Sequence, residues 1–245
     1  MSGGQPPAGY VRVHATRWRC SVTTLESHAD DALAMLEAGP LHQSASRMTN
    51  ARPLEGRGVA YAVRLPHTGT PAVVRHNRHG GVFAPVTRDL FLAPTRAPYE
   101  LRMSLMLNER GVPTPAVLMV GVQEVLGPWC RADVMTREVE GARDLAEFMQ
   151  PGVDAAQRAA AWAAARDLLA RLDAAGVRHH DLNVKNVLLS PGGDAMTAWL
   201  LDVDRVAIGA RSSQWAWANH ARLLRSARKW RDERGAVFDE RELAA

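Results

Sequence analysis

The stretch "RHHDLNVKNVLLS", residues 178–190, places Asp181, Lys185 and two asparagines just before an apolar run. The next apolar segment, "AWLLDVD" at 198–204, carries Asp202 sixteen positions after Asn186. A hairpin of these two segments would bring Asn186 close to Asp202. An amide oxygen and a carboxylate oxygen are hard ligands suited to Mg²⁺, and Asp181 could orient an attacking hydroxyl. The spacing therefore indicates phosphoryl transfer.

A long helix and a short hairpin are predicted to position these groups. The helix begins near Asp154, with Gln157 as its capping partner, and Gly176 would end it. One helical face is apolar and consists of Trp162, Ala165, Leu169 and Leu172. The other elements expected here are a strand over 186–190, a turn over 191–193, a strand over 198–204 and a last helix over about 214–231.

The N-terminal half reads mainly as strands. Two stretches predict a hairpin with glycines at its entrance, "LEGRGVAYAVRL" at 54–65 and "TPAVVRHNRHGGV" at 70–82. Residues 1–9 read as a disordered tail. The other expected elements are helices over 30–38, 98–110 and 142–149 and strands over 116–125 and 131–137. This order predicts an α+β protein with an N-terminal lobe, 1–138, and a helical C-terminal lobe, 139–245.

The composition is typical of a globular protein, with 47% hydrophobic and 23% charged residues. The two cysteines, Cys20 and Cys130, lie far apart and in no metal-ligand spacing, so a reducing cytoplasm is expected. We find no signal peptide and no apolar run long enough for a membrane span. A net charge of +4 favours acidic partners: nucleotides, phosphorylated substrates, nucleic acid or an anionic membrane surface.

Five stretches in order resemble a known family. "HHDLNVKNVLL" resembles the catalytic loop of protein-kinase-like folds, and "LLDVDR" resembles their metal-binding Asp turn. The Asp-Leu-Asn form is more similar to the lipopolysaccharide-core sugar kinases, in particular the 3-deoxy-D-manno-octulosonic acid (Kdo) kinases. The further similar stretches are "GRGVAY" at 56–61, "VVRHNRHGG" at 73–81 and "NHARLLRSARKW" at 219–230. Single motifs of this kind are weak, but five in order over residues 54–230 are specific.

The resemblance implies a protein-kinase-like two-lobed fold, with a small antiparallel sheet lobe followed by a helical lobe with a reduced C-terminus. It implies that Asp181 is the catalytic carboxylate and that Asn186 and Asp202 bind Mg²⁺. The nucleotide contacts that it implies are Gly56 and Gly58 in a loop over the phosphates, Arg75 on the phosphates with Glu100 as its partner, and Thr136 to Val139 as a hinge against the adenine.

The implied activity is ATP-dependent phosphorylation of a Kdo hydroxyl, O-4 in this family, during assembly of the lipid A/lipopolysaccharide inner core. The acceptor would be a glycolipid of the Kdo-lipid A type, at the cytoplasmic face of the inner membrane. His180 replaces the Arg that reads a phosphorylated activation loop in protein kinases, so such control is not expected. Few residues follow Asp204, which favours a small or lipid-linked acceptor over a peptide.

Other interpretations stay open at this stage. The loop at 181–186 could be an Asx-rich turn that only satisfies backbone groups, and Arg75 and Glu100 could be a surface ion pair. The basic face of the last helix, with Arg222, Arg225 and Lys229, could be solvated or could bind an anionic acceptor or membrane. The rival functions are another small-molecule kinase, acting on heptose or an aminoglycoside, and an inactive kinase-like binding protein. No nucleic-acid module is recognisable, so no nucleic-acid partner is expected.

Overall fold

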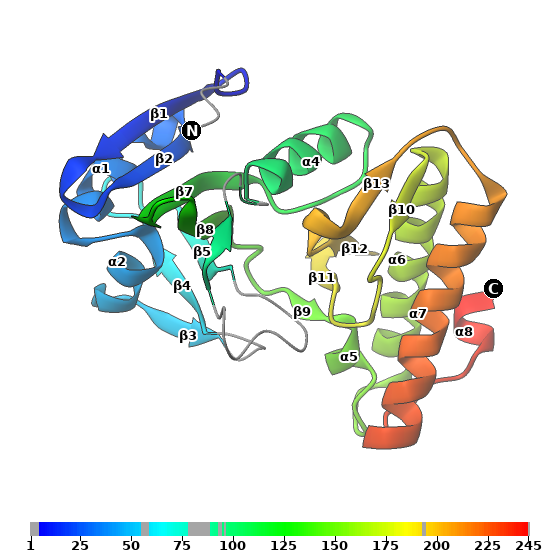
Figure 1. Ribbon diagram of the computed structural model, residues 1–245. Coiled ribbons are helices and arrows are strands. Elements are labelled where there is room, and N and C mark those ends of the chain that lie inside the picture. Colours follow the sequence, from blue (N-terminus) through cyan, green and yellow to red (C-terminus); the bar gives the residue numbers. More distant parts are fainter. Residues whose placement is uncertain are drawn as a thin grey trace. The chain divides into compact units, whose positions relative to one another are not determined.

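The computed structural model describes residues 5–54, 59–77, 89–92, 95, 97–192 and 195–244. The chain forms two compact units, the first with Met1–Arg102 and Ala116–Glu138, the second with Met103–Pro115 and Val139–Ala245 (Figure 1). Residues 103–115 thus group with the second unit, although the predicted division placed them in the first. Two hydrogen bonds explain this: Leu200 N–H donates to the Pro113 carbonyl at 2.8 Å, and the Thr114 hydroxyl donates to the Leu200 carbonyl at 2.9 Å.

An antiparallel sheet forms the framework of the first unit. Its strands follow the order β1-β2-β7-β8-β5-β4-β3, and β6 pairs with β8. The strands are β1 (Tyr10–Ala15), β2 (Cys20–Leu25), β3 (Arg52–Leu54), β4 (Ala60–Arg64), β5 (Pro71–His76), β6 (Phe91–Leu92), β7 (Val117–Leu126) and β8 (Trp129–Arg137). The predicted hairpin is present as β4 and β5, in the register Ala60↔Arg75 to Arg64↔Pro71, while residues 78–82 of the second predicted strand lie outside the described residues.

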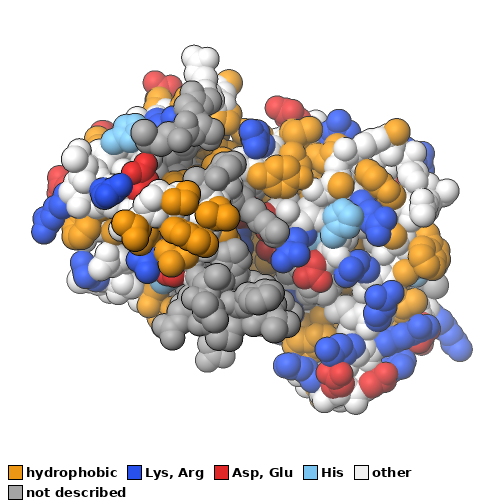
Figure 2. All heavy atoms as spheres, viewed as in Figure 1, with side chains coloured by type: hydrophobic (Ala, Val, Ile, Leu, Met, Phe, Trp, Pro, Cys, Tyr) orange, Lys and Arg blue, Asp and Glu red, His pale blue; other side chains and the backbone are white. Residues whose placement is uncertain are grey.

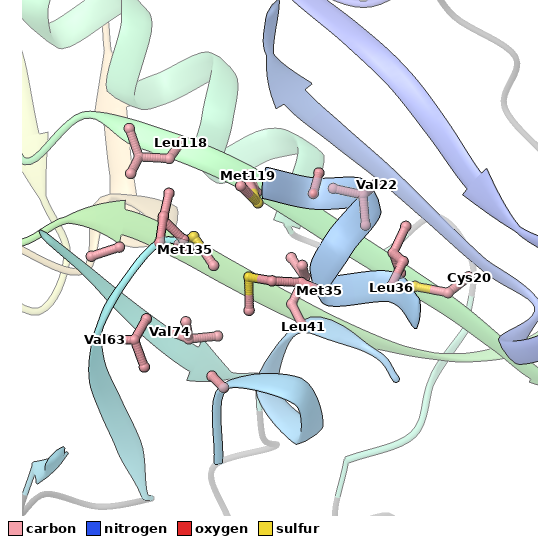
Figure 3. Packing of buried hydrophobic residues seen from close by; sticks show 14 residues of the cluster. Cys20, Val22, Met35, Leu36, Leu41, Val63, Val74, Leu118, Met119 and Met135 are labelled. Carbon is pink, nitrogen blue, oxygen red and sulfur yellow. The ribbon is translucent and has the colours of Figure 1, made fainter. Parts of the chain in front are cut away.

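The core of this unit lies between the sheet and two helices, α1 (Ala29–Ala38) and α2 (Leu41–Arg47). Figure 3 shows Met35 and Leu41 from these helices among side chains of the strands. The buried residues labelled there are Cys20, Val22, Met35, Leu36, Leu41, Val63, Val74, Leu118, Met119 and Met135. Gly39 follows the last residue of α1, and a glycine can leave the helical conformation there without steric cost.

The hairpin of β1 and β2 was not predicted from the sequence. A 3-10 turn, Thr16–Trp18, joins the two strands, and Tyr10 O–H donates to the Val117 carbonyl at 2.5 Å. Residues 1–4 of the expected disordered tail lie outside the described residues. Residues 7–9 form a turn, in which Tyr10 N–H donates to the Pro7 carbonyl and Glu26 N–H donates to the Gly9 carbonyl.

Helices and two small sheets make up the second unit. Its helices are α5 (Leu145–Phe148), α6 (Ala155–Ala174), α7 (Ser213–Arg234) and α8 (Arg241–Ala244), and α4 (Ala97–Glu109) ends in it. One sheet has the order β12-β11-β9, with β9 (Arg143–Asp144), β11 (Val187–Gly192) and β12 (Ala195–Leu200). The other pairs β10 (Val177–His179) with β13 (Val206–Ile208). Of the helices in the described ranges, none has the length and apolar character that a bilayer-spanning segment needs.

Two local predictions in this unit need correction. The expected helix over 142–149 is shorter, because Arg143 and Asp144 pair with β11 and only Leu145–Phe148 are helical. Asp144 caps that helix through a full capping box with Glu147. Asp154 does cap α6, but its carboxylate accepts from the backbone N–H groups of residues 156 and 157, so the predicted pairing with the Gln157 side chain is not the contact that forms.

Candidate active site

His179, the last residue of β10, lies directly before the polar loop at 181–186 and is fully buried. Its Nδ1 atom accepts a hydrogen bond from Asp181 N–H at 3.0 Å, and its Nε2 atom lies 3.0 Å from the Leu201 carbonyl oxygen. Because the amide only donates and the carbonyl only accepts, the ring is neutral and carries its hydrogen on Nε2. Burial lowers the pKa of His179, and this outweighs the opposing effects of the Leu201 carbonyl and of the Asp202 and Asp181 charges. The neutral ring therefore joins the start of the loop to the end of β12.

Two asparagine amides fix the backbone at Asp181. The Nδ2 groups of Asn183 and Asn186 both donate to the Asp181 carbonyl, each at 2.9 Å. Asn183 Oδ1 also accepts from Lys185 N–H at 3.0 Å. Asn183 thus plays the structural part that an Asx turn predicts, whereas Asn186 uses only its amide nitrogen in this way. The Asp181 side chain itself stays about 42% exposed, so its carboxylate is open to a substrate.

Asp202 is held next to this loop by the hairpin of β11 and β12. Leu201 N–H donates to the Asn186 carbonyl at 2.9 Å, so residue 202 directly follows a residue bonded to Asn186. Asp202 has φ 60° and ψ 47°, a left-handed conformation that only one other non-glycine residue in the described ranges adopts. Such a conformation costs about 1–2 kcal/mol, and residues that adopt it cluster at active sites and ligand-binding segments.

The side-chain oxygens of Asn186 and Asp202 suit a divalent cation. Among the described residues, none donates a hydrogen bond to Asn186 Oδ1 or to the Asp202 carboxylate. Aspartate is a favoured helix N-cap, yet the Asp202 side chain does not cap the 3-10 turn Val203–Arg205 that follows it. One amide oxygen and one carboxylate are therefore left as hard ligands on adjacent segments.

Helix α7 supports the loop along its whole length, a feature that the sequence did not reveal. The buried Asn219 amide accepts from His179 N–H at 3.0 Å and donates to the Val177 carbonyl at 2.8 Å. Arg222 Nη1 lies 3.7 Å from Asp181 Oδ1. Further along the helix, Ser226 Oγ accepts from Val184 N–H at 3.2 Å. Lys185 Nζ lies over the Trp230 ring, 5.9 Å from its centroid. Positions 219, 222, 226 and 230 share one helical face, so this face sets the path of the loop.

A second ion pair fixes the loop from the other side. Lys185 Nζ pairs with the Asp144 carboxylate, which also caps α5. Burial raises the pKa of Asp144, although the Lys185 charge acts in the opposite direction. Asp144 was not among the predicted site residues, because its contact depends on the pairing of β9 with β11. Lys185 is therefore occupied by a structural partner here.

The predicted nucleotide contacts are placed only in part. Gly56 and Gly58 lie outside the described residues. Arg75, on β5, forms an ion pair with the buried Glu100 of α4, so this pair is not a fully solvated surface pair. Thr136 lies on β8 opposite Val73, and Val139 lies in the segment that follows that strand.

His76, the neighbour of Arg75, is held between two carboxylates. Its Nδ1 lies 2.6 Å from an Asp133 oxygen, and its Nε2 lies 3.1 Å from an Asp89 oxygen. Burial lowers the pKa of His76, but these hydrogen bonds and charges outweigh it and the pKa is raised. Asp133 also accepts from the His42 backbone N–H at 3.0 Å. This network fixes the end of β5 directly after the arginine.

Comparison with known proteins gives consistent matches. A model of the lipopolysaccharide kinase (Kdo/WaaP) family matches residues 43–240. The chain is 37% identical over 191 residues to a 3-deoxy-D-manno-octulosonic acid kinase of Xanthomonas campestris pv. campestris (strain B100), covering 75% of this chain and 72% of that protein. It is 32% identical over 192 residues to one of Actinobacillus succinogenes, covering 76% and 78%.

A solved structure is similar in fold. It is titled "WaaP in complex with acyl carrier protein" and aligns with a TM-score of 0.52 at 18% identity, over 82% of this chain and 78% of that one. The likeness agrees with the predicted α+β, protein-kinase-like fold. In this chain, the unit with the antiparallel sheet comes first in the sequence, apart from residues 103–115, and the mainly helical unit follows.

Proposed function

Because the chain belongs to the lipopolysaccharide kinase (Kdo/WaaP) family, we propose that Asp181, Asn186 and Asp202 form the phosphoryl-transfer site of this ATP-dependent sugar kinase. One observation carries the assignment. The loop at 181–186 and the end of β12 are tied together through His179 and through the Asn186 carbonyl, and the side-chain oxygens of Asn186 and Asp202 accept no hydrogen bond within the described part of the chain.

Each residue has a separate task in this proposal. Asp181 accepts or orients the proton of the attacking sugar hydroxyl, and the two asparagine amides on its carbonyl keep it in place. Asn186 and Asp202 hold Mg²⁺, which supplies charge neutralisation at the transferring phosphate when it is bound. The neutral His179 keeps the two segments together without adding a positive charge between them. The nucleotide roles of Gly56, Gly58, Arg75, Glu100, Thr136 and Val139 remain predictions that rest on the family.

We assign Kdo as the acceptor sugar, presented on a glycolipid of the lipid A type. The relatives that carry this chemistry in their names are 32–37% identical over about three quarters of the chain. The product would be a phosphorylated Kdo in the lipopolysaccharide inner core, and O-4 is the hydroxyl that the family suggests. Nothing in the described residues favours heptose or an aminoglycoside instead.

The test is ATP consumption with a Kdo-bearing lipid A precursor, compared with heptose-bearing and aminoglycoside acceptors. Asp181→Asn keeps the size of the side chain but removes its basicity, so kcat should fall about a hundredfold to ten-thousandfold. Asp167→Asn is the matched control, since Asp167 lies on the exposed side of α6 in an i,i+4 pair with Arg171, and kcat should stay within twofold.

Two results would count against this assignment. Turnover with Kdo that is unchanged in Asp181→Asn would remove the catalytic role of that residue. Faster turnover with one of the other acceptors than with the Kdo glycolipid would replace the substrate. ATP binding without turnover of any acceptor would instead favour the inactive binding protein.

We propose that the enzyme works as a peripheral protein at an anionic membrane surface, where its lipid-linked acceptor lies. The support is helix α7, over which Lys and Arg side chains gather in Figure 2. Trp217 on the same helix is 70% exposed, and tryptophan favours membrane interfaces. Sedimentation with vesicles that contain anionic lipid, but not with neutral vesicles, is the expected result, and equal sedimentation with both would refute an electrostatic contribution.

A further inference from the structure

Arg222 and Arg225 differ from Arg228 and Arg231, two other arginines of α7. Arg228 forms two bonds to Glu240, at 2.8 and 2.6 Å, and Arg231 lies 2.9 Å from Asp232. These two arginines are therefore already neutralised by close carboxylates.

Arg222 has only a loose partner. Its Nη1 atom is 3.7 Å from the Asp181 carboxylate, whereas a charge-assisted N–H···O bond is about 2.7–2.9 Å long. Arg225 is exposed, and it forms no ion pair with any residue that the structure describes. The two guanidinium groups start one helical turn apart, three residues along the chain, so they lie on the same side of α7. Positive charge that is not neutralised is thus concentrated beside Asp181.

The exposure of this pair leaves room for an incoming anion. The side chains of Arg222 and Asp181 are 39% and 42% exposed. A guanidinium group binds a carboxylate through two parallel N–H···O bonds, which a 3.7 Å contact to one Asp181 oxygen does not provide. An anionic group on the acceptor could therefore gain a better geometry with Arg222 than Asp181 has now.

We propose that Arg222, assisted by Arg225, binds the carboxylate of the acceptor sugar and so places its hydroxyl at Asp181. This inference rests on the proposed function, because the acceptor there is an octulosonic acid and carries a carboxylate. Specificity for an acidic sugar follows: a neutral sugar would leave Arg222 beside Asp181 and would lack the contact that orients its hydroxyl.

The experiment compares the Kdo glycolipid with its carboxyl methyl ester, which keeps every hydroxyl but loses the charge. We expect the ester to raise the acceptor KM of the wild-type enzyme about tenfold to a hundredfold, the range for a hydrogen bond to a charged group. Arg222→Gln should raise the acceptor KM by a similar factor with the acid, leave the KM for ATP within twofold, and show little further loss with the ester. Arg222→Lys keeps a positive charge but cannot form two parallel hydrogen bonds, so its KM for the acid should lie between those of the wild-type enzyme and Arg222→Gln.

Arg211→Gln is the control, because the Arg211 guanidinium lies outside α7 and already bonds to Asp173 at 3.0 and 2.6 Å, and its acceptor KM should match the wild-type value. Three outcomes would overturn the inference. The wild-type enzyme could have the same KM for the acid and for the ester, or Arg222→Gln could raise the KM for the acid and the KM for the ester by the same factor. The third outcome is that Arg222→Gln raises only the KM for ATP. The last would assign Arg222 to a nucleotide phosphate. If the wild-type enzyme does not phosphorylate the acid at all, the proposed function itself is refuted. If the wild-type enzyme phosphorylates the acid but the acid and the ester have equal KM values, only the role of Arg222 is refuted.

Discussion

Replacement of Asn219 by leucine tests whether α7 holds the catalytic loop. Leucine has nearly the same size, so the change removes two hydrogen bonds without opening a large cavity. It leaves His179 N–H and the Val177 carbonyl without their partner in a place where only 1% of the Asn219 surface is exposed. A buried unpaired group costs about 1–3 kcal/mol, so the free energy of unfolding should fall by about 2–6 kcal/mol.

Asn50→Leu provides the matched comparison. Like Asn219, Asn50 bonds to one backbone N–H and one backbone carbonyl, in this case both of Arg64, at 3.3 and 3.0 Å. Asn50 is exposed, so water can replace its side chain. We expect this control to lose less than about 1 kcal/mol. Urea unfolding gives both values, and exchange of the His179 amide hydrogen should accelerate in Asn219→Leu.

Activity adds an independent measurement. If the loop moves by about 1 Å when Asn219 is lost, kcat should fall on the order of a hundredfold. A loss of stability equal to that of Asn50→Leu, with unchanged kcat, would refute the view that α7 positions His179 and Asp181.

Further predictions concern Gly176, at the turn before β10, and the histidines His179 and His76. Gly176→Ala should lower the free energy of unfolding by about 1–3 kcal/mol more than Gly127→Ala, as measured by thermal or urea unfolding. Both glycines have positive φ, but only at Gly176 would a Cβ atom meet a backbone oxygen, at 2.2 Å. Equal losses in the two variants would refute this. Folding lowers the pKa of His179, so its contribution to stability should be complete above the unfolded pKa of about 6.5 and should decline as the pH falls below that value. In His179→Gln, the free energy of unfolding in urea should therefore depend less on pH below about 6.5. The pKa of His76 is raised, so its contribution should be complete below about 6.5 and be lost as the pH rises through the folded value; a profile that His76→Gln leaves unchanged would contradict this sign.

The elements with strong local signals could be predicted from the sequence. Helix α6 has a capping aspartate at 154 and a glycine stop at 176, and the structure gives Ala155–Ala174. The hairpin of β11 and β12 follows from two apolar segments a short distance apart in the chain, and it places Asn186 near Asp202. The spacing of these residues was readable because a short hairpin restricts the possible geometries.

Other elements have weaker signals in the sequence. The strand β1, "YVRVHA", alternates apolar and polar residues, but it lies at the sheet edge and buries only Tyr10 fully, so its pattern competes with that of a solvated tail. The strand β9 has two residues, too few for any periodicity, and its existence depends on β11. Asp144 was missed for that reason.

The contacts of α7 could not be predicted from the sequence, because they join segments about forty residues apart. Nothing in "NHARLLRSARKW" distinguishes the buried Asn219 from an exposed asparagine, and the basic spacing of Arg222 and Arg225 fits a solvated face equally well. The choice depends on which side of the helix faces the loop, and a helix with apolar residues on more than one side leaves this undecided.

The division of tasks between the two segments explains why the reactive residues were easier to find than their supports. A carboxylate that takes a proton and oxygens that bind a cation have few chemical substitutes, so the loop must contain Asp and Asn in a fixed order. A support needs only to satisfy backbone groups at the right place, and His179 N–H would accept an amide, hydroxyl or carboxylate partner from any element that reaches it. The chemistry therefore leaves a local pattern, whereas the positioning of Asp181 is distributed over a distant helix whose contribution only the packed structure reveals.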